Sequence, residues 1–277
     1  MYHVHRIASL DLPELAPYRT LKLPHEHRER GFFVAEGDKV VHRLLASALE
    51  IVSVLVPEHR LAEYEPALQA RTEDVLTFCV TDKRVLEELV GFEMFQGVMA
   101  VAKIPAQLSL AELLCTSQPP RLFAAADGLT SAENVGVLTR NCVAFGAQAL
   151  LVGETSASPY LRRAVRNSMG TVFQLPILET DNLAKALQDL RTHGVRCVAA
   201  HPHTEKKFLS ETDFRTDTCI VFGAEGNGIS PDVLATCDEA VAIPMPPNVD
   251  SLNVASAAAV FLYAASQQKA PHRPNRT

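Results

Sequence analysis

Short apolar runs alternate with amphipathic stretches through the second half of the chain. The apolar runs lack regular polar alternation, as in RLFAAAD at 121–127 and TCIVFG at 218–223. Strands that are buried on both faces have this pattern, and the helices between them supply the cover. The sequence therefore predicts a parallel α/β sheet with strands at 121–127, 149–152, 172–176, 195–200, 218–223 and 240–244.

Helix boundaries in this half are marked by capping residues. Thr130 and Glu133 have the spacing of a capping box, and Gly146 is placed to end the helix that they open. Ser158 before a proline and Ser251 before a run of small residues are further N-cap signals. The predicted helices are 130–146, 158–169, 182–193 and 252–268.

The first 105 residues have the pattern of a separate small α/β domain. Its predicted strands are 31–37, 51–57, 75–81 and 97–105, with helices at 39–49 and 82–89. The sequence TSQPP at 116–120 is the clearest linker signal. We therefore expect domains at 1–105 and 121–277, joined by a linker at 106–120.

Composition narrows the class of protein. The 277 residues are 47% hydrophobic and 21% charged, which is typical of a globular chain that needs no disulfide or metal to hold its core. The six cysteines form no CxxC pair, and no run of 18 apolar residues or N-terminal apolar segment occurs. We expect a cytoplasmic protein without a metal site or membrane span. The net charge of −6 argues against nucleic-acid binding by bulk charge alone, and leaves local basic patches open.

A glycine-rich loop follows the strand at 218–223. Its spacing in FGAEGNGIS is GxxGxG, the reverse of the dinucleotide fingerprint, and Glu225 lies in its middle. A carboxylate is the wrong group to face a pyrophosphate. The loop therefore indicates either a ligand without phosphates or a turn with no ligand.

Three other groups of residues could carry chemistry. Asn134 and Arg140 lie on one predicted helix but are about 600° of rotation apart, so they do not share a face. Ser251 and Asn253 open the last helix, where a serine can also be a simple cap. Arg162, Arg163 and Arg166 cluster with no acid between them, which suits either phosphate contact or a solvated face. A more dilute basic stretch runs from Arg19 through Arg28 to Arg30.

Taken together and in this order, three segments resemble the sequence motifs of the SpoU/TrmH family of RNA ribose 2′-O-methyltransferases. They are NVGVLTRNCVAFGA, IVFGAEGNGIS and IPMPPNVDSLNVASAAA. The match spans about residues 121–268, and GFFVAEGDKVV resembles the substrate-binding domain that often precedes it. The resemblance implies an α/β knot, in which the C-terminal segment threads through a loop, a rare exception to the rule against knots. It also implies S-adenosylmethionine as the cofactor.

The same resemblance assigns residues to roles. It implies that Arg140 is the catalytic residue that deprotonates the 2′-hydroxyl, accompanied by Asn134, Glu225, Ser251 and Asn253. Because an arginine is a poor base at neutral pH, a role in binding the neighbouring phosphate and stabilising the alkoxide stays open beside it. It places the cofactor against two loops, at Phe222, Gly223, Ala224, Gly226, Gly228, Ile243, Met245, Ser251 and Leu252. Because the chain is net acidic, we expect the RNA to contact its local basic clusters, at Arg19, Arg28, Arg162, Arg163 and Arg166. Subunits would pair through the C-terminal domain, and the broad apolar surface of the helix at 252–268 points to the same homodimer.

One departure and three alternatives qualify this interpretation. Pro247 and Asn248 stand where the family's third motif usually has a glycine, and Asn248 can take its place if the backbone there is left-handed. A nucleotide-dependent oxidoreductase is disfavoured by the reversed glycine spacing. A methyltransferase acting on a base nitrogen and an inactive RNA-binding protein of the same fold remain. The separate N-terminal domain favours ribosomal RNA over tRNA as the substrate.

Overall fold

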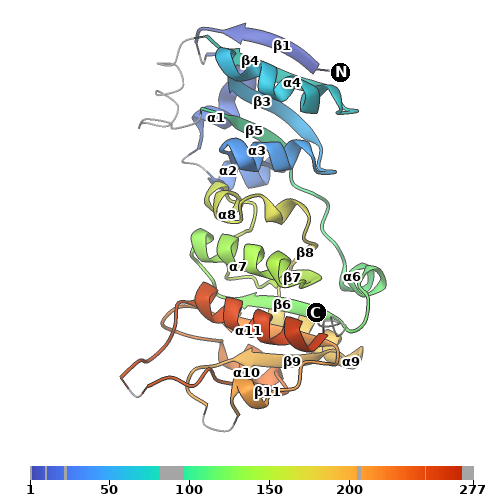
Figure 1. Cartoon of the computed structure of the whole chain (residues 1–277), viewed down its shortest axis with the longest axis vertical. Coiled ribbons are helices and arrows are strands. Elements are labelled where there is room, and N and C mark those ends of the chain that lie inside the picture. The colour runs from blue at the N-terminus through green and yellow to red at the C-terminus, as the bar shows by residue number, and fades with distance from the viewer. Residues whose placement is uncertain are drawn as a thin grey trace, which may run out of the picture. The chain divides into compact units, whose positions relative to one another are not determined.

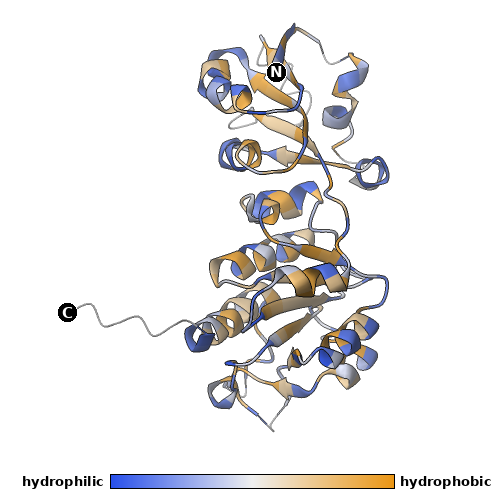
Figure 2. Cartoon of the chain, turned by 90° about the vertical axis from the view of Figure 1, so that its right-hand side faces the viewer, coloured by the Kyte–Doolittle hydropathy of each residue, from blue (hydrophilic) through white to orange (hydrophobic). Residues whose placement is uncertain are grey.

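Two compact units make up the chain in its computed structural model, which describes residues 2–9, 11–21, 24–81, 97–204, 207–246 and 248–269. Unit 1 consists of Met1–Ala106 and Pro159–Gln174, and unit 2 of Gln107–Ser158 and Leu175–Thr277. The contacts thus group residues 159–174 with the N-terminal unit, although the motifs on either side of them lie in unit 2. Figure 2 shows hydrophobic residues gathered along the strands of both units.

Unit 2 is built on a six-stranded sheet in which every neighbouring pair is parallel. The strand order is β11-β9-β10-β6-β7-β8, so strands from early and late in the unit meet at β6 and β10. The strands are β6 (Leu122–Asp127), β7 (Ala149–Val152), β8 (Ile177–Glu179), β9 (Arg196–Ala200), β10 (Thr218–Gly223) and β11 (Glu239–Val241). The parallel sheet predicted from uninterrupted apolar runs is confirmed.

Helices cover this sheet on both faces. On one face, α6 (Leu110–Thr116), α9 (Leu183–Thr192) and α10 (Pro231–Thr236) share a buried apolar cluster with the strands. On the other face, α7 (Ala132–Ala144) and α11 (Val254–Lys269) lie side by side (Figure 1). Because β11 is at the sheet edge and α11 packs on central β10, the chain after β11 must return across the carboxyl ends of the strands.

The helix starts differ from two of the predictions. Ser131, and not Thr130, is the N-cap of α7, and its hydroxyl accepts the Asn134 N–H. Helix α11 begins at Val254, and the side-chain oxygen of Asn253 accepts the main-chain N–H of the second and third helical residues. Asn253 therefore caps this helix, and the prediction that Ser251 does so is wrong.

The segment from 158 to 179 also departs from the prediction. Helix α8 spans only Arg162–Asn167, and its N-cap residue is Leu161. Ser158, which was predicted to be the cap, donates its hydroxyl hydrogen bond to Glu179 instead. The predicted strand at 172–176 is wrong: residues Thr171–Phe173 form a 3-10 helix, and the strand begins at Ile177. Gly170, with φ of 79°, turns the chain between α8 and that helix. The helix predicted at 82–89 lies outside the described residues.

Unit 1 has a mixed five-stranded sheet of order β1-β4-β3-β5-β2. Strands β1, β4 and β3 are parallel, and β5 is antiparallel to both β3 and β2. The strands are β1 (Tyr2–Ile7), β2 (Phe32–Glu36), β3 (Ile51–Pro57), β4 (Val75–Val80) and β5 (Met99–Lys103). The helices, besides α8, are α1 (Ala16–Arg19), α2 (Pro24–Glu29), α3 (Asp38–Leu45) and α4 (Leu61–Gln69). Short 3-10 helices cover Pro13–Leu15 and Glu58–Arg60 in unit 1, and Leu209–Glu211 in unit 2.

Residues 159–174 belong to unit 1 through specific contacts with β2. The ring of Phe33 packs against Tyr160 at 5.5 Å and stacks on Phe173 at 5.7 Å between ring centroids. The Glu36 carboxylate, whose side chain is 7% exposed, pairs with both Arg162 and Arg166 of α8. Aromatic packing and a buried ion pair together fix this segment on the edge strand.

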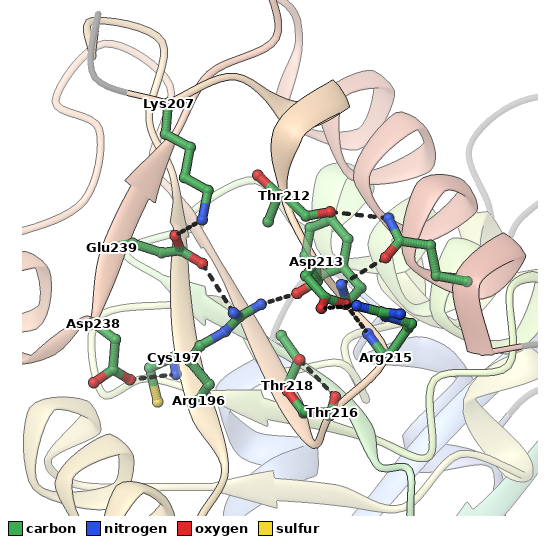
Figure 3. Close-up of polar contacts among 12 residues, drawn as sticks. Arg196, Cys197, Lys207, Thr212, Asp213, Arg215, Thr216, Thr218, Asp238 and Glu239 are labelled. Atoms are coloured by element: carbon green, nitrogen blue, oxygen red, sulfur yellow. Dashed lines mark hydrogen bonds and ion pairs between the residues drawn. The ribbon is translucent and has the colours of Figure 1, made fainter.

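A polar network ties the loop between β9 and β10 to the end of α11 (Figure 3). Arg196 donates to the main-chain oxygen of Asp213 and lies 3.5 Å from the Glu239 carboxylate. The Gln268 side chain accepts the Phe214 N–H at 2.8 Å. These contacts lie at the amino ends of β9, β10 and β11, away from the carboxyl ends at which ligands bind in parallel sheets.

Candidate functional site

A cavity of about 620 Å³ opens at the carboxyl ends of β9, β10 and β11. Its walls come from the glycine loop after β10, the segment between β11 and α11, and the first turns of α11. Phe222 and Phe261 form part of an apolar wall, with their rings edge to face at 6.0 Å. This is where a parallel sheet is expected to bind a ligand.

The glycine loop has one fixed shape because its two arms touch. Ala224 and Gly228 exchange both main-chain hydrogen bonds at 2.9 Å. A Cβ at Gly223 would lie 2.2 Å from the main-chain carbon of Gly228, so no other residue fits there. Gly226 and Gly228 have φ of 88° and 68°, which favour glycine. The loop thus presents main-chain groups closely to the cavity.

Three polar side chains meet at Asn253, at the start of α11. The Asn253 Nδ2 donates to Glu225 Oε1 at 2.6 Å and to Asn134 Oδ1 at 3.2 Å. The Asn253 Oδ1 accepts the N–H of Ala255 at 2.9 Å and of Ser256 at 3.3 Å. The amide therefore uses both of its N–H groups and both acceptor positions. Glu225 and Asn253 line the cavity, and Asn134 reaches it through this contact.

Arg140 lies apart from that cluster. It is exposed on α7, on the side that also carries Val137 and Ala144. It does not line the cavity, and it makes no ion pair or hydrogen bond with any residue in the described part of the chain. The expectation from helical rotation, that Arg140 and Asn134 do not share a face, agrees with this placement.

The residues predicted to bind the cofactor all line this cavity: Phe222, Gly223, Ala224, Gly226, Gly228, Ile243, Met245, Ser251 and Leu252. Three further lining residues were not predicted from the sequence: His201 and His203 in the loop after β9, and Asp250 before α11. His201 directly follows the carboxyl end of a predicted strand, and the rule that ligands lie beyond such ends could have identified it. Pro247 lies outside the described residues, so the left-handed backbone expected at Asn248 stays a prediction.

The five arginines predicted to contact RNA all fall in unit 1. Arg19, Arg28, Arg163 and Arg166 are exposed, whereas Arg162 is half-buried against Glu36. Arg166 shares the same carboxylate, so part of the cluster's positive charge is offset within the unit. Burial lowers the pKa of His27 in α2, which keeps that imidazole neutral at pH 7.

The charges around the cavity favour a cationic ligand without phosphates. The described residues that line it include the carboxylates Glu225 and Asp250 and no lysine or arginine. Among the described residues, no group of three His, Cys, Asp or Glu side chains is placed to hold a metal ion. Burial raises the pKa of the Cys142 thiol well above its usual range, which leaves it inert at neutral pH. No described helix is both long and apolar enough to span a bilayer.

Known proteins resemble the chain over between half and nearly all of its length. The profile of the SpoU rRNA Methylase family matches residues 121–263. An uncharacterised tRNA/rRNA methyltransferase of Mycobacterium tuberculosis is 30% identical over 267 residues, which cover 94% of this chain and 91% of that protein. A 23S rRNA (guanosine-2′-O-)-methyltransferase of Ralstonia nicotianae is 32% identical over 189 residues, covering 68% of this chain and 76% of that protein.

Solved structures match in the same way. The crystal structure of an RNA 2′-O ribose methyltransferase is 29% identical and superposes with a TM-score of 0.77, covering 95% of this chain and 99% of that one. An AdoMet-bound rRNA methyltransferase from Sinorhizobium meliloti shares the fold, with a TM-score of 0.81 at 23% identity and coverage of 95% of this chain and 98% of that one.

The fold and the cavity define an RNA methyltransferase of the knotted α/β class. The chain belongs to the SpoU rRNA methylase family. The resemblance found in its three motifs is thereby confirmed, as are the knotted fold and the assignment of S-adenosylmethionine as cofactor.

The residues of the cavity fit this cofactor. S-adenosylmethionine carries a positive sulfonium and no phosphate, and the cavity offers two carboxylates and no basic side chain. The two arms of the glycine loop lie close together at Gly223, where no side chain fits. Main-chain groups of the loop can therefore contact the amino-acid part or the purine edge of the cofactor. Apolar side chains at Phe222, Ile243 and Leu252 supply the walls that an adenine ring requires.

Proposed function

We propose that this protein transfers a methyl group to a ribose 2′-hydroxyl of ribosomal RNA. The observation that carries the proposal is the junction at Asn253, which holds a carboxylate and a second amide together at the edge of the cofactor cavity. The Ralstonia relative and the crystal structure at 29% identity, both 2′-O-methyltransferases by name, support the same choice of acceptor atom.

The polar groups at this junction suit the handling of a hydroxyl group. All hydrogen-bonding positions of the Asn253 side chain are occupied. Within this cluster, the side-chain N–H groups of Asn134 and the Oε2 of Glu225 have no partner among the described residues. An amide N–H donates to a ribose or phosphate oxygen, and a carboxylate oxygen accepts from the hydroxyl. Ser251, which lines the same cavity, adds a hydroxyl. We assign Asn253 the task of orienting its two neighbours.

Bound S-adenosylmethionine supplies an electrophilic methyl group, so this chain must hold the acceptor oxygen in line and remove its proton. Holding two reactants in a productive geometry can contribute about 7–11 kcal/mol to lowering a barrier. In this chain, two features hold the walls of the cofactor cavity in a fixed geometry. They are the glycine loop, which is closed by its own hydrogen bonds, and the contact between Asn253 and Glu225.

Arg140 acts on the RNA and not on the cofactor. A guanidinium stays protonated at neutral pH, so it is a poor base and a good ligand for phosphate or for a developing alkoxide. Its exposed position, with no partner in the described part of the chain, leaves all of its N–H donors available to RNA. The family position of Arg140 and this availability together support a role in stabilising the transition state. Because Arg140 does not line the cavity of its own chain, we assign that role to the Arg140 of the second copy in the homodimer proposed below.

Unit 1 supplies the RNA-binding surface. It holds all five predicted arginines, and three of them lie in the segment 159–174, which contains no acidic residue. Because the whole chain is net negative, such a local patch must provide the attraction for RNA phosphates.

A homodimer through unit 2 completes the proposal. Helix α11 buries Ala258, Phe261 and Leu262, yet it also leaves Val260 42% exposed and Tyr263 54% exposed. Tyr263 packs edge to face on Phe145 at 5.9 Å, so the exposed apolar surface continues onto the end of α7. A second copy of this chain would cover that surface with closed two-fold symmetry.

The acceptor atom can be located with labelled methyl groups. Ribosomal RNA from cells that lack this protein should accept label from S-adenosylmethionine, and the labelled linkage should resist alkali, because alkaline cleavage requires a free 2′-hydroxyl. A 2′-deoxy nucleotide at the mapped position should abolish transfer, and transfer RNA serves as the comparison substrate. Label recovered on a nucleobase, or labelling of tRNA alone, would contradict the proposal.

Replacement of Arg140 tests its role separately from cofactor binding. Arg140→Ala should reduce the rate of methyl transfer about 100-fold or more, as loss of a transition-state donor does, with the Kd for S-adenosylmethionine unchanged. Arg140→Lys keeps the charge without the planar fork and should recover only part of the rate. Near wild-type turnover by Arg140→Ala would show that the assignment is wrong.

Light scattering tests the dimer. The chain has a mass of 30.2 kDa, and we expect about twice that mass at micromolar concentration. Val260→Asp should shift the mass to that of a single chain, whereas Val52→Asp, at a valine in unit 1 that is 37% exposed, should not. A wild-type mass near 30.2 kDa would rule out the dimer.

A further inference from the structure

Asp127 is a buried carboxylate next to the cofactor cavity that does not line it. It is the last residue of β6, is 7% exposed, and pairs in register with Gly223 at the end of β10. Its Oδ2 accepts the main-chain N–H of Ser230 at 2.6 Å. No ion pair joins Asp127 to a lysine or arginine in the described part of the chain. A buried carboxylate with a main-chain donor and no basic partner among the described residues suggests a defined task.

The glycine loop runs from Gly223 to Ser230, and both of its ends are held. Its first residue, Gly223, is part of β10. Its last residue, Ser230, is held by the contact with Asp127. Between them the loop is a tight turn closed by the two main-chain hydrogen bonds between Ala224 and Gly228. The Asp127–Ser230 bond connects the loop's far end to the neighbouring strand, β6.

We propose that Asp127 is a positioning residue for the cofactor cavity, which it shapes by holding the glycine loop at Ser230. Two consequences follow from its loss. The wall formed by residues 223–229 would no longer have one position against the cavity. Glu225, at the tip of the loop, would also lose its fixed approach to Asn253, which lies 2.6 Å away.

The chain contains a matched control at the opposite end of the same two strands. Asp217 directly precedes β10, and its Oδ1 accepts the main-chain N–H of Arg121, which directly precedes β6, at 2.7 Å. Both aspartates therefore accept one main-chain N–H across the β6–β10 pair. Asp217 differs in that it also pairs with the Arg121 guanidinium at 2.6 Å. Asp217 lies at the amino ends of the strands, away from the cavity, so its loss should affect stability alone.

The experiment measures the Kd of S-adenosylmethionine by calorimetry, together with the thermal unfolding midpoint of each unliganded variant. Asp127→Ala should raise the Kd about tenfold or more, as expected for loss of a bond to a charged group. Asp127→Asn keeps an acceptor oxygen and should stay within about threefold of wild type. Asp217→Ala should lower the unfolding midpoint and leave the Kd within about threefold.

Ser230→Pro tests the same bond from the donor side. It removes the N–H at a position whose φ of −61° already suits proline, and it should raise the Kd as Asp127→Ala does. This variant also serves if Asp127→Ala does not fold. An unchanged Kd in both variants, or an equal rise in Asp217→Ala or Asp127→Asn, would overturn the proposal. Failure of the wild-type protein to bind the cofactor would instead contradict the cofactor assignment.

Discussion

The geometry of the site depends on one amide, the side chain of Asn253. It joins three segments that are distant in sequence, because its partners Asn134 and Glu225 lie 119 and 28 residues away. The same side chain starts α11 by capping it. The same side chain therefore contributes both to the stability of α11 and to the geometry of the site. The position at which α11 begins determines where Glu225 and Asn134 are held.

The topology of the sheet makes this meeting possible. Parallel strands place all of their carboxyl ends on one edge, so the loops after β6, β9 and β10 open on the same side. The return from edge strand β11 to α11 then brings the last loop across that edge. The absence of space at Gly223 fixes the glycine loop, and the Asn253 contact fixes its tip. A cavity of fixed shape follows from covalent connection, sterics and a few hydrogen bonds.

Much of this arrangement could be predicted from the sequence, because the physical signals were local. Apolar runs indicated the parallel strands, and loops at their carboxyl ends indicated the cavity. The capping role of Asn253 could not be predicted, because Ser251 is an equally good cap until the tertiary contacts of α11 select its first turn. One of these is the bond from Asn141 of α7 to the Ala255 carbonyl at 2.7 Å. The placement of 159–174 depends on Phe33, more than 120 residues earlier in the chain, and no local pattern reports such a contact.

Substitution of Asn253 by aspartate tests most directly whether the junction organises the site. Aspartate caps a helix as well as asparagine does, so unfolding free energy should stay within about 1 kcal/mol of wild type. It cannot donate to Asn134 and it repels Glu225, so methyl transfer should fall about 100-fold or more, the order found when one preorganised donor is lost. Asn253→Ala is the comparison, and it should lower both the free energy of unfolding, through loss of the cap, and the rate of methyl transfer. Wild-type turnover by a stable Asn253→Asp variant would contradict the account.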